Sequence, residues 1–483
     1  MSTSPHRIAI IGAGFSAHAA AIAILRQTTQ PVRIALIDPR KECGGLAYGQ
    51  AGDAHILNTR ASQFSIIPDD PLDFVRWVRD SISGLKDAEG VQDAYLPRRL
   101  VQDYIRQRLA EAAANQSLAD VLRIQSRVAE VSVQGGIYRL RLTNGANFEA
   151  DIAILASGYG SERRLNFGLD PFGDMSTRRA SQASRVAFVG SGLTFIDSYL
   201  RIRALGFKGE AISVSKSARL PAAHADHHVR PVPLGLAPGE SLRDIMRAAR
   251  ARSETLDASS DWRGIINGLR AEAQPLWQSL TPADKARFDR HVRPIWDRLR
   301  HRAPPHLQSA VVRDIAAGSL RLEKGRVTAT RHGFNGWTID AERAGERSRL
   351  GPFDLVFDCS GPAVRSVHPL AAPLIAAGHA QKNPHGGLSV KRDGSVIAAN
   401  GSVTPGLFAL GPLGAGSLLE ITAAPEIVAQ SDALARSLAA YPPAQSNPNP
   451  KPKEIKNARR PSRAESRAAR AVAVQSARPR PRG

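Results

Sequence analysis

The sequence predicts an α/β protein with two repeated strand–turn–helix units, and three observations support this fold class. Aliphatic runs break into glycine-rich turns and continue as helix-like segments at residues 7–17 and 185–197. Further apolar runs of the kind found in buried parallel strands occur at residues 151–157 and 353–359. The chain has 483 residues, 42% hydrophobic and 23% charged, which is ordinary for a globular protein of more than one domain. Together these features indicate two Rossmann-like domains.

The first turn lies in the sequence RIAIIGAGFSA at residues 7–17. Ile8, Ile10 and Ile11 predict a central strand, and residues 18–27 predict a helix. Between them stands the pattern G-x-G-x-x-A, in which the first glycine permits a tight turn and the second lets the backbone approach a pyrophosphate. The next strand, residues 32–37, ends in an acid placed to bond a ribose hydroxyl. The predicted dinucleotide contacts are Gly12, Gly14, Phe15, Ser16, Ala17 and Asp38.

A second turn of the same kind lies in RVAFVGSGLTFID at residues 185–197, before a helix through about Leu205. The strand that follows, residues 211–215, ends at a lysine instead of an acid, and a cation there suits the 2′-phosphate of NADPH. The predicted contacts are Gly190, Gly192, Leu193, Thr194, Lys216 and Arg219. Phe195 is larger than this pattern prefers, so its helix is expected to lie further from the sheet. A glycine-rich turn without a ligand is the alternative.

Two such units about 180 residues apart are the arrangement expected of a protein that binds FAD and NAD(P)H, with NADPH favoured and NADH still possible. The segment DIAILASGYG at 151–160 resembles the strand that returns the chain to the FAD domain, and residues 353–361 repeat it. A late strand at residues 406–411 precedes a helix at 425–438, whose N–H groups would face the flavin pyrimidine. The predicted flavin contacts here are Gly158, Gly411, Glu420, Ile421 and Thr422.

These motifs divide the chain into four parts. Residues 1–165 form the first part of the FAD domain, residues 180–360 the NAD(P)H domain with a helical insertion at 240–303, and residues 361–441 the return to the FAD domain. Residues 442–483 form a basic tail; its last 33 residues hold 11 Lys or Arg and 2 Glu, +9 of the net charge of +21. The tail has almost no large apolar residue, so we expect it to be disordered. Its charge suits either a solubilising extension or contact with nucleic acid or acidic lipid.

With these motifs in place, the chain resembles a bacterial FAD/NAD(P)-binding protein family related to class B flavin monooxygenases. The resemblance covers residues 5–440 and includes GGLAYG (44–49), YLPRRL (95–100), VGSGLTFID (189–197) and LFALGPLGAGSLLEITAAPEIVAQ (407–430). It implies a two-dinucleotide-domain flavoprotein of the glutathione-reductase and flavin-monooxygenase kind. The chain departs from the family at Lys216, where Arg is common, at Phe195, where a smaller aliphatic residue is usual, and in its basic tail.

Asn58 is the residue that the resemblance connects with oxygen chemistry. Asn58-Thr59 followed by IIPDDP at 66–71 is similar to the Asn-Thr…Phe-Pro-Asp stretch of flavin-containing monooxygenases, whose asparagine amide lies near the flavin C4a atom. A neutral amide donor can stabilise a developing negative oxygen without supplying a proton. The alternative is that Asn58 caps a turn.

The insertion supplies the candidates for a substrate pocket. Segments 242–252, 261–277 and 282–302 have helical periodicity, and the third carries many Arg and His beside aromatic residues. We interpret His291, Arg293 and Trp296 as a group that could wall a pocket for an anionic substrate; a solvated cationic face is the alternative.

Several classes of protein are excluded. Cys43 and Cys359 form no CxxC pair, which excludes dithiol–disulfide chemistry and favours a reducing cytoplasm. No run of 18 apolar residues predicts a membrane span, and we expect no signal peptide. His224, His227 and His228 lie in a Pro-rich loop that lacks a fixed facial geometry and offers no paired cysteine or carboxylate set, so we predict no metal. A loop over the nicotinamide is one alternative for this segment.

These observations predict an FAD-dependent, NAD(P)H-oxidising oxidoreductase. The resemblance favours a monooxygenase that uses O₂ and a C4a-(hydro)peroxyflavin to hydroxylate a small molecule at nitrogen, sulfur or carbon. A reductase or oxidase with the same cofactors is the first alternative. A flavin-bound factor that contacts RNA or protein through its tail is the second.

Overall fold

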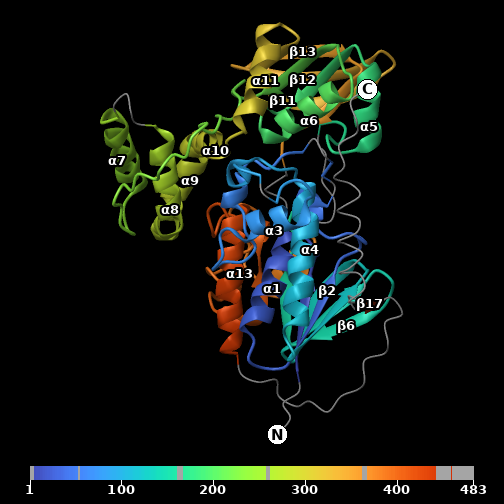
Figure 1. Ribbon diagram of the computed structural model, residues 1–483, viewed down its shortest axis with the longest axis vertical. Coiled ribbons are helices and arrows are strands. Elements are labelled where there is room, and N and C mark those ends of the chain that lie inside the picture. Colours follow the sequence, from blue (N-terminus) through green and yellow to red (C-terminus); the bar gives the residue numbers. More distant parts are fainter. Residues whose placement is uncertain are drawn as a thin grey trace. The chain divides into compact units, whose positions relative to one another are not determined.

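The computed structural model describes residues 5–49, 51–52, 55–86, 88–159, 167–256, 261–361, 367–441 and 458–459 (Figure 1). The chain divides into two compact units. Unit 1 consists of residues 1–52, 59–162 and 364–483, and unit 2 of residues 53–58 and 163–363. The functional domain bounds inferred from the motifs stay a prediction.

Unit 1 is built on a seven-stranded sheet, in which five neighbouring strands run parallel and each outermost strand is antiparallel to its neighbour. In spatial order the strands are β15 (Ser395–Ile397), β16 (Val403–Ala409), β7 (Ile152–Leu155), β1 (His6–Ile11), β2 (Val32–Ile37), β3 (Ala119–Ile124) and β17 (Ala458–Arg459). β1 lies in the middle, between β7 and β2, and is almost entirely buried. Its carboxyl end therefore meets the ends of both neighbours at one edge of the sheet.

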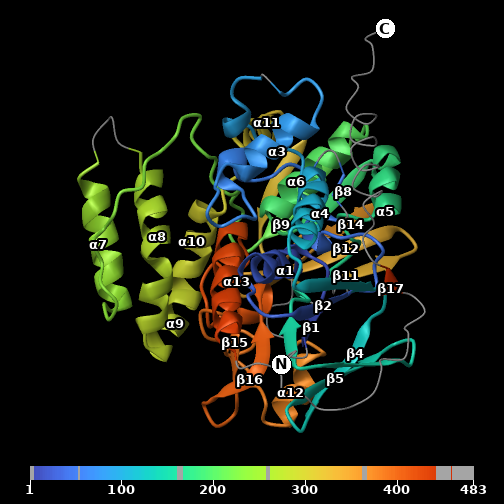
Figure 2. The same cartoon turned by 60° about the horizontal axis from the view of Figure 1, so that its bottom comes forward.

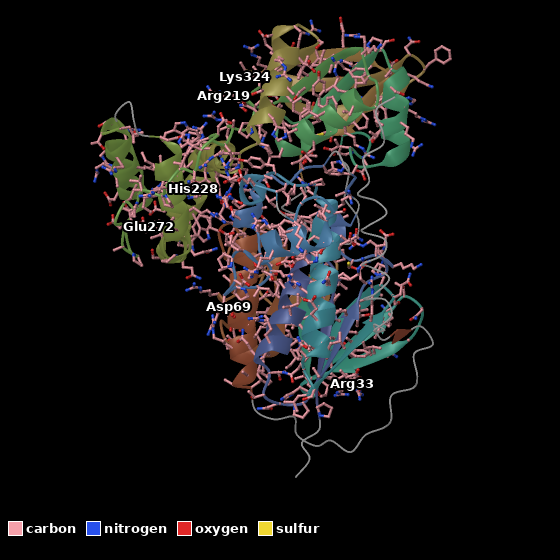
Figure 3. The ribbon with its side chains drawn as sticks, viewed as in Figure 1. Arg33, Asp69, Arg219, His228, Glu272 and Lys324 are labelled. Carbon is pink, nitrogen blue, oxygen red and sulfur yellow. The ribbon has the colours of Figure 1, made fainter. Side chains whose placement is uncertain are left out.

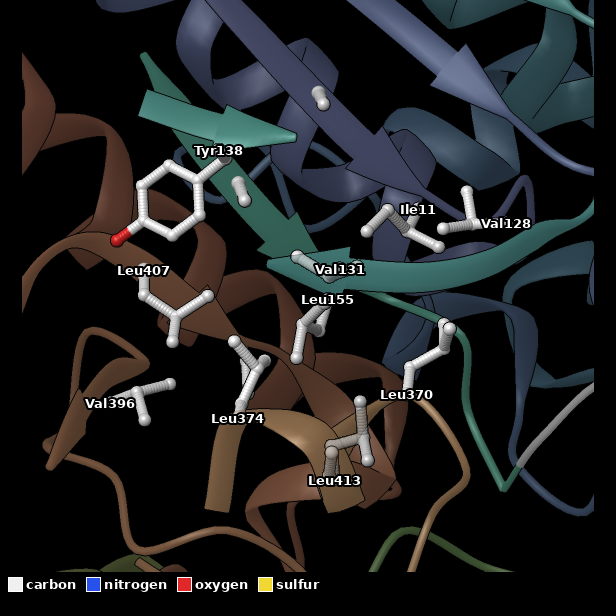
Figure 4. Packing of buried hydrophobic residues seen from close by; sticks show 14 of the residues in the cluster. Ile11, Val128, Val131, Tyr138, Leu155, Leu370, Leu374, Val396, Leu407 and Leu413 are labelled. Atoms are coloured by element: carbon white, nitrogen blue, oxygen red, sulfur yellow. The ribbon is translucent and has the colours of Figure 1, made fainter. Parts of the chain in front are cut away.

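Helices and a small antiparallel sheet cover the two faces of this large sheet. Ala-rich α1 packs with α13 and α4 on one face (Figure 2). Its small buried side chains allow a close approach to the strands. On the other face, Val131 and Tyr138 of the small sheet pack with Leu155 and Leu374 (Figure 4). These elements are α1 (Phe15–Gln27), α4 (Arg99–Ala114), α13 (Ala424–Ala439), β4 (Val128–Gln134), β5 (Ile137–Leu142), β6 (Asn147–Ala150) and α12 (Ala371–Ala376).

Short elements make up the rest of unit 1. Phe64, Phe74 and Tyr104 pack edge to face or tilted, and the Tyr104 hydroxyl donates to Asp73, so α3 is fixed against α4. The short elements are α2 (Gly45–Tyr48), η1 (Ala61–Gln63), α3 (Asp73–Ser81), η2 (Val91–Asp93) and η5 (Gly411–Gly414).

Unit 2 repeats the same plan on a smaller scale. Its parallel sheet has the order β10 (Leu320–Lys324), β9 (Glu210–Ser215), β8 (Arg185–Val189) and β14 (Leu355–Asp358). The antiparallel strands β11 (Arg326–Gly333), β12 (Gly336–Arg343) and β13 (Glu346–Phe353) precede β14, as β4–β6 precede β7 in unit 1. The accompanying helices are α5 (Asp174–Arg179), η3 (Ala180–Gln182), α6 (Leu193–Ala204) and α11 (Pro305–Ala316).

The insertion of unit 2 is helical, as predicted, and its third segment contains a π-helical turn. It contains α7 (Leu242–Glu254), α8 (Arg263–Ser279), α9 (Pro282–Arg287), the π-helical turn η4 (Phe288–Val292) and α10 (Arg293–Arg300). Residues 282–300 are helical without interruption, and a π turn replaces the regular α-helix at 288–292. Pro294 has no N–H for the regular α-helical bond, and the chain takes a π turn just before it.

The other elements follow the sequence pattern closely. The structure confirms the predicted α/β fold with two Rossmann-like sheets, and β2 has the predicted bounds. Apart from the two residues of β17, the predicted disordered tail at 442–483 and its nucleic-acid contact lie outside the described residues. Among the helices that the structure describes, none is long and apolar enough to cross a membrane.

Candidate dinucleotide-binding sites

The first glycine-rich turn joins β1 to α1 at the carboxyl edge of the unit 1 sheet. Gly12 has a φ of +124°, and a Cβ at this position would lie 2.5 Å from the carbonyl oxygen of Ala156. Its N–H donates to the Ile37 carbonyl at 2.8 Å, which fixes the turn between the ends of β2 and β7. Both the backbone angle and the neighbouring carbonyl therefore require glycine here.

Gly14 is the N-cap of α1 and brings no side chain over the first turn of the helix. It lies against the Gly44–Gly45 segment, where an added Cβ would stand 3.5 Å from the Gly45 Cα. The first turn of α1 contains no acidic residue, so its N–H groups and the helix dipole present a positive end. Ala17 is fully buried, which lets α1 lie close to the sheet as predicted.

The segment that follows β16 also contacts the first glycine-rich turn. Gly411 has a φ of +64°, and a Cβ there would lie 2.5 Å from the Ser16 Oγ. Buried Gln430 accepts a hydrogen bond from the Gly411 N–H at 3.0 Å and so holds the segment in place. The structure thus brings together two predicted site residues separated by almost 400 positions. Farther along, Glu420 has a φ of +58°, Ile421 is buried and Thr422 is exposed.

Asp38 lies directly after β2 and is 5% exposed. Its Oδ2 accepts from the Ala13 N–H at 3.0 Å, and Arg40 bonds both oxygens through its backbone N–H and its guanidinium. Burial raises the pKa of this carboxyl, but the bonds and charge of Arg40 and the Ala13 N–H lower it more, so the net pKa is below its usual value. Asp38 is therefore a carboxylate held against the turn, and a ribose hydroxyl would share it with Arg40.

The second turn has the same build in unit 2. Gly190 has a φ of +107°, its Cβ would lie 2.5 Å from the Cys359 carbonyl oxygen, and its N–H donates to the Val214 carbonyl at 2.8 Å. Gly192 is the N-cap of α6, with Leu193 and Thr194 beginning the helix. Phe195 is fully buried, with its ring edge-on to Phe188 of β8, so an aromatic layer separates helix from strand.

Three exposed cations stand at the carboxyl edge of the unit 2 sheet: Lys216, Arg219 and Lys324. Figure 3 labels Arg219 and Lys324. Lys324 ends β10 and pairs in register with Ser215, the last residue of β9. Buried Ser191 holds the loop, because its hydroxyl contacts the Ser215 Oγ at 2.9 Å and donates to the Arg219 carbonyl at 2.8 Å. Within the part of the chain that the structure describes, none of the three cations forms an ion pair with an acid.

Arg40, Ser191 and Lys324 were missed by sequence reasoning. Arg40 had a local signal, since it lies two residues after the predicted strand-end acid. Lys324 had a weaker signal, a lysine that closes a short apolar strand. Ser191 had none beyond its place between the two glycines.

Asn58 groups with unit 2 through its contacts. His224 lies in the Pro-rich loop, and its Nε2–H donates to the Asn58 carbonyl at 2.8 Å. His227 lies 3.9 Å from the Asp261 carboxylate, and His228 is exposed (Figure 3). The three histidines thus have different surroundings, and the flavin-proximal role of Asn58 stays a prediction.

The pocket candidates of the insertion have different environments. Arg293 forms an ion pair with Asp289 at 2.7 Å, and its guanidinium lies 5.8 Å from the Trp277 ring centroid. Trp296 is 7% exposed, whereas His291 is exposed. These contacts give Arg293 and Trp296 a packing role within the insertion, and their contact with substrate stays a prediction.

The residues of both turns fit a bound dinucleotide. A Cβ on Gly192 would meet no atom within 4 Å, so the protein itself does not require glycine there; the open space suits a ligand close to the backbone. Gly158, with a φ of +63°, also faces open space. Two uncapped helix starts at the carboxyl edges of parallel sheets therefore offer two anion sites.

Comparison with known proteins agrees with this architecture. The chain has the fold of two-dinucleotide-domain flavoproteins: an ornithine N-hydroxylase from Kutzneria sp. 744 matches with 15% identity and a TM-score of 0.61, over 90% of this chain and 99% of that chain. A cadaverine monooxygenase from Erwinia amylovora matches with 14% identity and a TM-score of 0.60, over 94% and 100%. An L-lysine 6-monooxygenase from Pseudomonas syringae matches with 16% identity and a TM-score of 0.57, over 90% and 99%.

Residues 9–160 match the model of the FAD-NAD(P)-binding family. This segment contains the end of β1, the first glycine-rich turn, Asp38 and the return strand β7. A comparison with curated protein sequences found no significant match.

Proposed function

We propose that this protein is an FAD-dependent, NAD(P)H-oxidising oxidoreductase, and more specifically a monooxygenase that acts on a small molecule. Unit 1 would hold FAD, and unit 2 would receive NADPH in preference to NADH. The overall reaction would convert NADPH, a proton, O₂ and the substrate to NADP⁺, water and the hydroxylated substrate.

The observation that carries this proposal is the presence of two glycine-rich turns of the same build in one chain. Each turn follows an inner strand of a parallel sheet, and a Cβ added to its first glycine would lie 2.5 Å from a carbonyl oxygen directly after the return strand. The first turn lies in the FAD-NAD(P)-binding family segment. A chain with two such sites has a place for a tightly held flavin and a place for a nicotinamide reductant.

The charges at the strand ends support a different ligand for each unit. The exposed cations of unit 2 suit a nucleotide with an additional phosphate, which is the difference between NADPH and NADH. The end of β2 in unit 1 instead carries the carboxylate of Asp38, which suits a ribose with free hydroxyls. Bound FAD would supply hydride acceptance and oxygen activation; the chain would bind both nucleotides at its helix starts and orient them.

Asn58 is our candidate for the flavin-proximal donor. Its backbone is held by the hydrogen bond from His224, which leaves the side-chain amide as a neutral donor. The absence of a CxxC pair from the sequence favours oxygen chemistry over dithiol reduction. The fold likeness to N-hydroxylating enzymes makes primary amines such as ornithine, lysine and cadaverine the first substrates to test, with thioethers next.

The test combines a substrate panel with isotopic oxygen. Each compound is incubated with the protein, FAD, NADPH and ¹⁸O₂, while NADPH consumption, hydrogen peroxide and product mass are measured. A monooxygenase gives a product with one ¹⁸O atom and NADPH consumption matched to product. NADPH oxidation that yields only hydrogen peroxide, or a reduced product without ¹⁸O, across the panel would instead support the reductase or oxidase.

A further inference from the structure

Ser157 lies at the carboxyl edge of the unit 1 sheet, beside the first glycine-rich turn. It follows the end of β7 by two residues, and its Cα would lie 3.4 Å from a Cβ placed on Gly12. Ligands of open parallel sheets bind at this edge. The side chain is half-buried, so part of it is accessible.

A buried histidine sets the orientation of this hydroxyl. His368 is 9% exposed, and its Nε2 lies 3.0 Å from the Ser157 Oγ. The Leu370 N–H donates to the other ring nitrogen, Nδ1, at 3.2 Å. A nitrogen that accepts this bond carries no proton, so the proton of the neutral ring is on Nε2. Burial lowers the pKa of His368 to about 4, which keeps the ring neutral near pH 7.

The Ser157 hydroxyl therefore accepts the hydrogen bond from His368, and its own proton is left to donate to another acceptor. The equivalent serine of unit 2 is used differently. Ser360 lies beside Gly190, with its Cα 3.2 Å from a Cβ placed there, but its hydroxyl donates to the Asp358 carboxylate at 2.6 Å. The hydroxyl proton of Ser157 in unit 1 is thus left to donate to a ligand, whereas that of Ser360 in unit 2 donates to Asp358.

We propose that Ser157 donates a hydrogen bond to an acceptor oxygen of the dinucleotide bound in unit 1, and that His368 is the positioning residue that directs this hydroxyl. The proposal rests on the proposed function only in that unit 1 binds FAD. It is independent of the reaction that follows.

The test measures binding of FAD to the apoprotein by flavin fluorescence and by titration calorimetry. Ser157→Ala is expected to weaken FAD about 5- to 20-fold, as for loss of a hydrogen bond to a charged or strongly polar acceptor. His368→Phe should cause a similar loss, and the double variant should lose no more than either single one. His368→Gln, whose amide can donate from about the place of Nε2, should recover most of the affinity. Ser360→Ala is the matched control and should bind FAD as the wild type does.

Thermal unfolding of each apoprotein separates binding from folding. If His368→Phe unfolds, the Ser157→Ala and His368→Gln variants still decide the question. Equal FAD affinity in Ser157→Ala and the wild type would overturn this inference but not the proposed function. The same would follow if His368→Phe weakened FAD binding as much in the Ser157→Ala variant as it does in the wild type. A wild-type apoprotein that binds no FAD would overturn the proposed function as well.

Discussion

The two glycine-rich turns share their backbone and differ in the side chains at the strand ends. In both, the first glycine donates to the second strand, from Gly12 to Ile37 and from Gly190 to Val214, each at 2.8 Å. This pattern makes Asp38 the counterpart of Ser215, because each follows the accepting residue. The backbone N–H of Ala13 donates to Asp38, whereas the side-chain hydroxyl of Ser191 contacts the hydroxyl of Ser215.

The comparison separates what builds such a turn from what selects its ligand. Positive φ and the approach of a return-strand carbonyl are common to both turns, so they belong to the fold. The buried acid with Arg40 in one unit and the exposed Lys216 and Lys324 in the other are not shared, so they can distinguish ligands. Four experiments challenge this division, in order of expected effect.

The largest effects are expected from Gly12→Ala and Gly190→Ala, the same change in each unit. Each new Cβ would stand 2.5 Å from a carbonyl oxygen and force alanine to a positive φ, which alone costs about 1–2 kcal/mol. We expect Gly12→Ala to be purified with less than a tenth of the wild-type flavin, and Gly190→Ala to retain flavin but bind NADPH at least about tenfold more weakly. Flavin absorbance per protein and NADPH titration measure the two outcomes.

Gly145→Ala is the control for backbone strain, because Gly145 also has a positive φ but open space around its Cβ position. It should change stability modestly and leave both ligands bound. Loss of flavin from both Gly12→Ala and Gly190→Ala would show that the two turns do not serve separate ligands.

The next experiment, Gly192→Ala, changes the space for ligand without a clash inside the protein. Gly192 has a φ of −80°, and its added Cβ meets no protein atom within 4 Å. The apoprotein should lose no more than about 1 kcal/mol, the cost of alanine at an N-cap. NADPH affinity should fall about tenfold, because the methyl group occupies space beside the helix start. Unchanged NADPH affinity in titrations would place the ligand away from this turn.

The cations at the end of the unit 2 sheet should have a selective effect. Lys216→Ala is expected to weaken NADPH about tenfold and NADH less than twofold, since only NADPH carries the 2′-phosphate. Lys324→Ala should act in the same direction, because Lys324 is in register with Ser215. KM values for both nucleotides at several salt concentrations measure the effect. Equal losses for NADPH and NADH would contradict a phosphate contact.

The turns themselves could be predicted from the sequence, because each is specified locally by a strand, two glycines and a helix. Even so, α1 begins at Phe15, three residues before the predicted start, since the backbone is already helical directly after Gly14. The π turn before Pro294 also had a local signal, the missing N–H of proline. The apolar periodicity predicts the helical segment but carries no information on this turn.

Contacts between segments that are distant in the chain could not be predicted from the sequence. His368 meets Ser157 across 211 positions, and Gly411 meets Ser16 only because the return segment packs against α1. The pairing of β10 with β9, which places Lys324 beside Ser215, likewise depends on strand register. Such residues depend on how the completed sheet brings its strand ends together, and no short motif encodes that.

The smallest expected effect concerns pH and the contrast between Asp38 and Ser215. Because the native pKa of Asp38 lies below its unfolded value near 3.8, the carboxylate stabilises the fold fully above that value and loses this effect as pH falls through the native pKa. Asp38→Asn should therefore be less stable than the wild type by about 1 kcal/mol at pH 7, because the amide oxygen still accepts but no longer carries a charge, with the gap closing toward pH 3. Ser215→Ala should show a gap that does not change with pH, since a hydroxyl does not titrate there. Urea unfolding of the apoproteins at pH 3–7 measures both gaps, and a constant gap for Asp38→Asn would mean that its charge contributes nothing to holding the first turn.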